Sequence, residues 1–350
     1  MSEKDLFYRH LLQQCQSPDL SQRLAALEDL SKLDYLDLVP GQFLLDRLNS
    51  TSIEREQTAI LEVMGQLPSP IPVEALLTIL ADRETSTTHL RAEVVHTLAV
   101  IKSEAAIGPL LRLLQEQDED LDLRRGIAED LESFGERLPF DALIEAVADP
   151  DIDISAAAMK AMSVQPSLIP IALLLQYRAH PEWYMREAVV KTLMATGERV
   201  PIEPIIAALG DPEPRVRAAA SRGCIRLLEW FGARVPLEPL LKSLADEYPP
   251  VRENILDAFG KVPLRIPVEP VAAALTDSTY YVRCAALETL GLMGERVPST
   301  LYPLLQEMSG SDPTPQARTR ATRALLLLHG MEPPPLRLPI IDFASEDLKE

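Results

Sequence analysis

The stretch "GERVPIEPIIAALGDPEPRVRAAA", residues 197–220, decides the fold because the chain repeats it. Residues 232–255 read "GARVPLEPLLKSLADEYPPVRENI", and residues 135–158 read "GERLPFDALIEAVADPDIDISAAA". Self-similarity at a period of roughly 20–50 residues is typical of repeat proteins, in which each unit packs mainly on its neighbours. The sequence therefore predicts a stack of similar units.

The arginine of "VRAAA", Arg217, is the reference point of the repeat, and we call its equivalents the anchor positions. Successive anchor positions are most often 31 residues apart, and short insertions account for the longer steps. They are Arg23, Glu54, Arg91, Arg124, Ser155, Arg186, Arg217, Arg252, Arg283 and Arg318. The spacing predicts ten units with a 31-residue period.

Each unit reads as a pair of helices. Pro201 and Pro204 suit the first turn of a helix, where a missing N–H costs nothing. A "D-P" turn ends this helix, and the anchor segment begins a second helix with apolar residues at helical spacing. A glycine such as Gly197 or Gly294 then closes the second helix. This pattern predicts that Phe259, Leu287 and Leu290 belong to the core.

An aspartate lies six residues before the anchor position in six units. It could cap the second helix, or it could pair with the arginine of a neighbouring unit. Because the Asp–Arg pair recurs, a structural ladder between repeats is favoured over a catalytic pair, which would normally occur once. The six aspartates are Asp118, Asp149, Asp211, Asp246, Asp277 and Asp312. The predicted ladder includes Asp211, Arg217, Asp246, Arg252, Asp277 and Arg283.

The segments "DPEPRVRAAASRGCIRLL" and "DSTYYVRCAALETLGLMGER" resemble HEAT repeats, in particular the short type found in phycobilisome (bilin) lyase proteins and bacterial scaffolds. The resemblance covers about residues 17–330. It implies an all-α fold, an α-solenoid of about ten stacked HEAT-like helix pairs. It also implies that the second helices line a concave binding surface. Glu54 and Ser155 depart from the anchor arginine, and His180 replaces the turn aspartate.

The two ends of the solenoid need covers for their apolar faces. Residues 1–16 are predicted to form a capping helix with Leu6, Phe7, His10, Leu11 and Cys15 on one face. Residues 17–330 form the repeats, and 331–350 form a proline-rich linker and an acidic tail. The apolar "LPIIDF" in that tail either folds over the last repeat or docks elsewhere, including onto a second copy of the chain.

The formal net charge is −19, and it is unevenly distributed. Residues 1–175 carry 14 Lys and Arg against 30 Asp and Glu, whereas residues 176–330 carry 18 of each. This balance argues against nucleic acid, which needs a basic surface, and predicts a basic partner for the acidic N-terminal half. No apolar run is long enough for a membrane span, and the three cysteines form no pairing motif. A cytoplasmic protein without a membrane partner is expected.

The residue five positions after the anchor is expected to point away from the core. Lys160, Lys191 and Arg222 hold this position in three consecutive units, and Arg226 and Lys261 extend the stripe. Such a stripe could bind an acidic peptide, a phosphate or a propionate, or it could be a solvated face paired with carboxylates. Five aromatic residues near the second helices could anchor a partner or pack on the next repeat. They are Trp183, Tyr184, Tyr248, Tyr280 and Tyr281.

Motifs of catalysis, phosphate binding and metal binding are absent from the sequence, and the five histidines are dispersed. No catalytic residue, cofactor or metal site is therefore predicted. The favoured interpretation is a non-catalytic scaffold that binds a protein or peptide on its concave face. A bilin-lyase-like subunit or chromophore chaperone is the first alternative. A nucleic-acid-binding protein similar to the HEAT-like DNA glycosylases is the second.

Overall fold

The computed structural model describes residues 3–33, 39–67 and 71–333 of the 350-residue chain. These residues form helices joined by turns, in two compact units, Met1–Leu174 and Leu175–Glu350. The division coincides with the change from an acidic to a neutral composition. Most of the predicted tail, residues 334–350 with "LPIIDF", lies outside the described residues.

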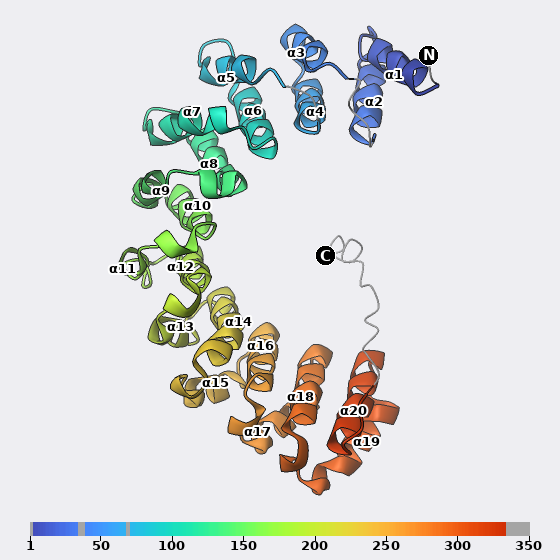
Figure 1. The fold of residues 1–350 in the computed structure, drawn as a ribbon, viewed down its shortest axis with the longest axis vertical. Coiled ribbons are helices and arrows are strands. Elements are labelled where there is room, and N and C mark those ends of the chain that lie inside the picture. Colours follow the sequence, from blue (N-terminus) through green and yellow to red (C-terminus); the bar gives the residue numbers. More distant parts are fainter. Residues whose placement is uncertain (1–2, 34–38, 68–70, 334–350) are drawn as a thin grey trace. The chain divides into compact units, whose positions relative to one another are not determined.

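The first unit stacks pairs of helices, with odd-numbered helices in one layer and even-numbered helices in the other (Figure 1). Its helices are α1 (Glu3–Gln14), α2 (Leu20–Ser31), α3 (Gly41–Ser50), α4 (Glu54–Gly65), α5 (Val73–Ala81), α6 (Thr88–Val100), α7 (Glu104–Gln115), α8 (Leu121–Asp130), α9 (Phe140–Val147), α10 (Ile152–Met162) and α11 (Ile171–Leu174).

The second unit has its own stack of helices in two layers, and α14 is its longest helix (Figure 1). Its helices are α12 (Trp183–Ala195), α13 (Ile202–Ala208), α14 (Pro214–Phe231), α15 (Leu237–Ser243), α16 (Pro249–Gly260), α17 (Val268–Ala273), α18 (Tyr280–Met293), α19 (Tyr302–Ser311) and α20 (Pro315–Leu328). All ten anchor positions lie on even-numbered helices, so the predicted second helices are confirmed.

The helix boundaries follow from local sequence. Pro201 is the N-cap of α13 and Pro214 is the first residue of α14, positions that tolerate a missing N–H. Gly197 and Gly294 follow α12 and α18 with φ of 64° and 58°, a conformation that costs glycine little. The predicted closing role of these glycines is confirmed.

The core of the second unit lies between successive even-numbered helices. Helix α14 packs on α16, α16 packs on α18, and α18 packs on α20. Phe259, Leu287 and Leu290 are fully buried there, as the sequence predicted. Burying a large apolar side chain contributes roughly 1.5–3 kcal/mol, so these contacts hold neighbouring repeats together.

The apolar face expected for residues 1–16 needs a correction. In α1 the buried side chains are Tyr8 and Leu11, followed by Cys15 just beyond the helix, whereas Leu6 and Phe7 are exposed. His10 is exposed as well. Positions 8, 11 and 15 share one side of a helix, and positions 6 and 10 lie on another side. Phe7, four residues before Leu11, lies at the exposed edge of the buried stripe. No helix within the described residues is long and apolar enough to cross a membrane.

Candidate partner-binding groove

The anchor arginines and turn aspartates form the frame on which the second unit is built. Each guanidinium binds the carboxylate of the following repeat through two nitrogens, at N–O distances of 2.7–2.9 Å. The pairs are Arg186–Asp211, Arg217–Asp246, Arg252–Asp277 and Arg283–Asp312. Bidentate pairs fix the geometry of both partners, so each pair orients one repeat on the next.

The same aspartates also hold the turn before the second helix. The carboxylate of Asp312 accepts the backbone N–H of Thr314 at 2.9 Å, and Asp246 accepts that of Tyr248 at 2.8 Å. The hydrogen bonds from Arg283 lower the pKa of Asp312 to about 2. The carboxylate of Asp312 is therefore held in the charged form by its structural bonds.

Two frame residues in the first unit were missed by the sequence pattern. Arg91 binds the buried Glu119 at 2.7 and 2.9 Å, whereas the neighbouring Asp118 is exposed and pairs with Arg83. Arg23 binds the buried Glu56 at 2.7 and 2.8 Å. Glutamate reaches farther than aspartate, so Glu119 binds its arginine from the residue after Asp118, and Glu56 does so from the first turn of α4. A search for aspartate alone could not find these pairs.

Helix α14 carries the candidate site. Its 18 residues exceed the 13 of α12 and the 12 of α16. Arg215, Arg222, Arg226 and Trp230 follow each other at intervals of seven, four and four residues, which places them along one side of the helix. The additional turn adds Trp230 to this side.

A groove of about 1070 Å³ lies along this side of α14, between α12 and α16. Small residues, including Ala218, Ala219 and Gly223, form part of its surface. A Cβ at Gly223 would stand 3.0 Å from Met194 Sδ, so glycine permits the close approach of α12 and α14. The charged and aromatic side chains of the lining are Glu187, Lys191, Arg215, Arg222, Arg226, Trp230 and Tyr248.

Most cations of the predicted stripe bind carboxylates of the chain itself. Lys191 pairs with Glu187 at 2.8 Å, and Arg226 and Lys261 both pair with Glu229, at 3.0 and 2.8 Å. Lys160, in the first unit, pairs with Glu132 at 2.8 Å. Exposed pairs of this kind contribute about 0–1 kcal/mol and exchange readily for another anion.

Two of the three arginines that line the groove, Arg222 and Arg215, differ from Arg226 in what they contact. Arg222 is exposed, and no carboxylate of the described residues forms an ion pair with it. The guanidinium carbon of Arg215 lies 4.9 Å from the ring centroid of Trp183, in a cation–π contact. The sequence pattern missed Arg215 because it precedes the anchor position by two residues, outside the positions used to define the stripe.

The candidate aromatic residues fall into three groups, of which one lines the groove. Tyr248, the exposed N-cap of α16, lines the groove. Trp183 and Tyr184 open α12 in an edge-on contact with centroids 5.8 Å apart. Tyr280 and Tyr281 form a similar contact at 5.5 Å at the start of α18, away from the lining of the groove. The structure thus brings Tyr248 together with the basic residues of α14.

Carboxylates lie beyond the groove on α16 and α18. Removal from water raises the pKa of Asp257 to about 6, and the negative charges of Glu253 and Glu288 add to this effect. Burial also raises the pKa of Glu253, against the opposing field of Arg222. Arg222 therefore lies within the field of a carboxylate without forming a close ion pair with it.

The cysteines and potential metal ligands of the described residues do not form a reactive centre. Cys15, Cys224 and Cys284 are buried and free. Burial raises the pKa of Cys224 to about 12, far from the value of a reactive thiolate. Within residues 3–33, 39–67 and 71–333, no group of three or more His, Cys, Asp or Glu could hold a metal ion.

The comparisons with known proteins agree with this architecture. A family model described as HEAT repeats matches residues 73–163 and 237–326. No curated protein matches the chain.

Solved structures with a similar fold include a complex of Kap95p with RanGDP, with a TM-score of 0.63 and 13% identity over 92% of this chain and 50% of that chain. The karyopherin Kap121p bound to the extreme C-terminus of the protein phosphatase Cdc14p has a TM-score of 0.53 and 15% identity. Kap121p bound to Nup53p has a TM-score of 0.52 and 15% identity. Both Kap121p alignments cover 94% of this chain and 42% of that chain, so the chain spans half or less of the length of these relatives.

Proposed function

Because this chain belongs to the HEAT-repeat family, we propose that it is a non-catalytic scaffold that binds a partner protein through its second helices. The proposal places the main contact on the groove along α14 in the second unit. In a solenoid this layer corresponds to the concave face. The comparisons support the fold, and the chemistry of the groove supports the kind of partner.

The observation that carries the proposal is the exposed Arg222, which pairs with no carboxylate of the described part of the chain and lines a groove together with Trp230 and Tyr248. Aromatic and arginine side chains provide much of the binding energy in protein interfaces. Small residues leave room for a main chain to approach, and the guanidinium group offers several donors to a carboxylate. An acidic segment of a partner protein fits this combination.

A protein ligand is consistent with what the similar solved structures bind. The Kap121p structures are described as complexes with Nup53p, with Pho4p and with the extreme C-terminus of Cdc14p. Their identity to this chain is 15%, so we transfer only the class of ligand, a segment of protein. The sequence of the partner is expected to differ.

We also propose a second contact, between the acidic first unit and a basic partner surface. Residues 1–174 carry 16 more acidic than basic side chains, since 30 Asp and Glu oppose 14 Lys and Arg. Such an excess attracts cationic surfaces at long range. Self-association through the tail and a cytoplasmic location remain part of the proposal, based on "LPIIDF" and on the unpaired cysteines.

The test is affinity capture from native lysate with wild type, Arg222→Glu and Lys242→Glu. Lys242 is an exposed cation of α15 in the same unit, outside the groove, so it controls for the change in charge. We expect a protein that wild type and Lys242→Glu retain and that Arg222→Glu loses. Identical partners for all three would contradict the assignment of the groove. A bilin absorbance in the wild-type eluate would instead support the lyase-like alternative.

A further inference from the structure

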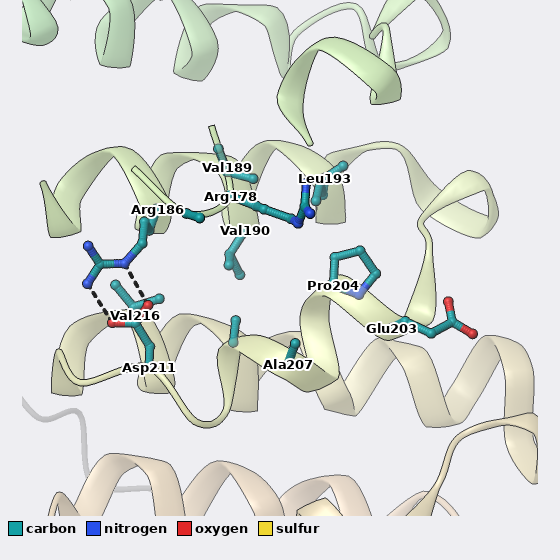
Figure 2. Close-up of a pocket in the computed structure, with 12 residues that line it drawn as sticks. Arg178, Arg186, Val189, Val190, Leu193, Glu203, Pro204, Ala207, Asp211 and Val216 are labelled. Atoms are coloured by element: carbon teal, nitrogen blue, oxygen red, sulfur yellow. Dashed lines mark hydrogen bonds and ion pairs between the residues drawn. The ribbon is translucent and has the colours of Figure 1, made fainter. Parts of the chain in front are cut away.

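A separate cavity of about 380 Å³ lies between α12 and α13 (Figure 2). Its walls are mainly aliphatic and include Val189, Val190, Leu193, Ala207 and Val216. Small-molecule sites commonly occupy about 300–1,000 Å³ and combine apolar walls with few polar groups. This volume suits a compact ligand and is small for a folded peptide segment.

The cavity lies beside a repeat that departs from its neighbours on both sides. Eight residues before the anchor position, the units anchored at Ser155, Arg217, Arg252 and Arg283 carry an aliphatic residue, which is buried in three of them (Val147, Leu209 and Leu275) and half-buried in the fourth (Leu244). The unit anchored at Arg186 has Arg178 at this position, and Arg178 is exposed. The first helix of this unit, α11, is also only four residues long. An aliphatic side chain that would fill the space between repeats is therefore missing.

The charged side chains around the cavity differ in whether they already bind a partner. Arg186 at one end is neutralised by two bonds of 2.7 Å to Asp211. Figure 2 shows the guanidinium of Arg178 over the aliphatic walls, whereas the carboxylate of Glu203 points away from them. Within the described residues, Arg178 donates to the backbone oxygen of Leu175 at 2.6 Å and forms no ion pair. The remaining N–H groups of Arg178 can therefore donate hydrogen bonds to an anion.

We propose that this cavity binds a small amphipathic carboxylate, such as a medium-chain fatty acid. The aliphatic body lies over Pro204, Ala207 and Ala208, the accessible part of the apolar walls, and the carboxylate pairs with Arg178. Replacing water around the chain by aliphatic walls provides the affinity, and the charge-assisted hydrogen bond selects the anion. This site is independent of the groove along α14, which lies on the other side of α12 as part of a different lining.

The test is isothermal titration of the full chain with sodium decanoate and with 1-decanol at neutral pH. We expect one saturable decanoate site in wild type and weaker binding of the uncharged alcohol. Arg178→Gln should weaken decanoate binding about tenfold or more and leave 1-decanol unchanged, because it removes the charged hydrogen bond. Arg178→Leu should abolish binding of both compounds, because the leucine fills the cavity as Leu209 does in its own repeat.

Lys242→Gln is the matched control, since it removes an exposed positive charge outside the cavity and should bind decanoate as wild type does. A thermal melt of Arg178→Leu checks folding, and a melting temperature at or above that of wild type is expected. The proposal is overturned if wild type has no saturable site, if 1-decanol binds as tightly as decanoate, or if folded Arg178→Leu retains the site.

Discussion

Each anchor arginine makes two kinds of bond at once. The guanidinium of Arg217 donates to the carbonyls of Asp211 and Pro212 in its own turn, at 3.1 and 3.0 Å. It also donates to the carboxylate of Asp246 in the next repeat. A turn and a junction therefore depend on one side chain, which explains why the residue recurs through the chain.

At this scale Asp312→Asn tests the frame. The low pKa of Asp312, about 2, means that its ion pair stabilises the fold fully above the unfolded-state pKa near 3.8 and loses this effect as the pH falls through the folded-state value. We expect the variant to lose about 2–3 kcal/mol of unfolding free energy at pH 7. The difference from wild type should shrink towards pH 2.

Urea unfolding followed by circular dichroism between pH 7 and pH 2 measures this effect. Glu307→Gln, on the exposed side of α19, is the control and should match wild type at each pH. A difference between Asp312→Asn and wild type that stays constant down to pH 2 would show that the carboxylate charge is not involved.

At the scale of helices, α18 shows why a period of 31 residues produces a stack. One side of α18 packs on α16 and the opposite side packs on α20, so ten residues of α18 are buried. The apolar face of such a helix is wide because the helix packs on two neighbouring helices. Thr289 fits this environment because its hydroxyl donates to the carbonyl of Leu256 on α16, at 2.8 Å.

Leu287→Asp and Leu292→Asp make a matched pair on α18. Leu287 is fully buried, whereas Leu292 is 53% exposed. Burying an unpaired carboxylate at position 287 should cost more than about 4 kcal/mol and lower the melting temperature by about 10 °C or more. The change at position 292 should cost less than about 1 kcal/mol. Similar melting curves for the two variants would contradict the assigned register of α18.

At the scale of the whole molecule, the two compact units differ more in charge than in fold. The first unit has 30 acidic and 14 basic side chains, and residues 176–330 of the second have 18 of each. Self-repulsion among like charges destabilises a compact state and is screened by salt. Repulsion among its acidic side chains therefore lowers the stability of the first unit, and a bound basic partner would reduce this repulsion.

Hydrogen exchange measured by mass spectrometry at about 50 and 500 mM NaCl tests this difference, since the Debye length falls from roughly 14 to 4 Å over that range. We expect amide protection in α2–α10 to increase with salt, and protection in α13–α20 to change less. An equal response of the two units would mean that net charge does not limit the stability of the first.

Sequence alone determined the helix pairs, the 31-residue period, the closing glycines and the buried side of α18, because these depend on local preference and on periodicity that repeats along the chain. Tertiary structure alone decided which cations keep a free charge. Lys160 pairs with Glu132 and Lys261 with Glu229 of the preceding repeat, whereas no carboxylate of the described residues pairs with Arg222, a difference set by distances between side chains of different helices. It also decided the size of the cavity beside Arg178, because the volume between helices depends on how neighbouring side chains pack.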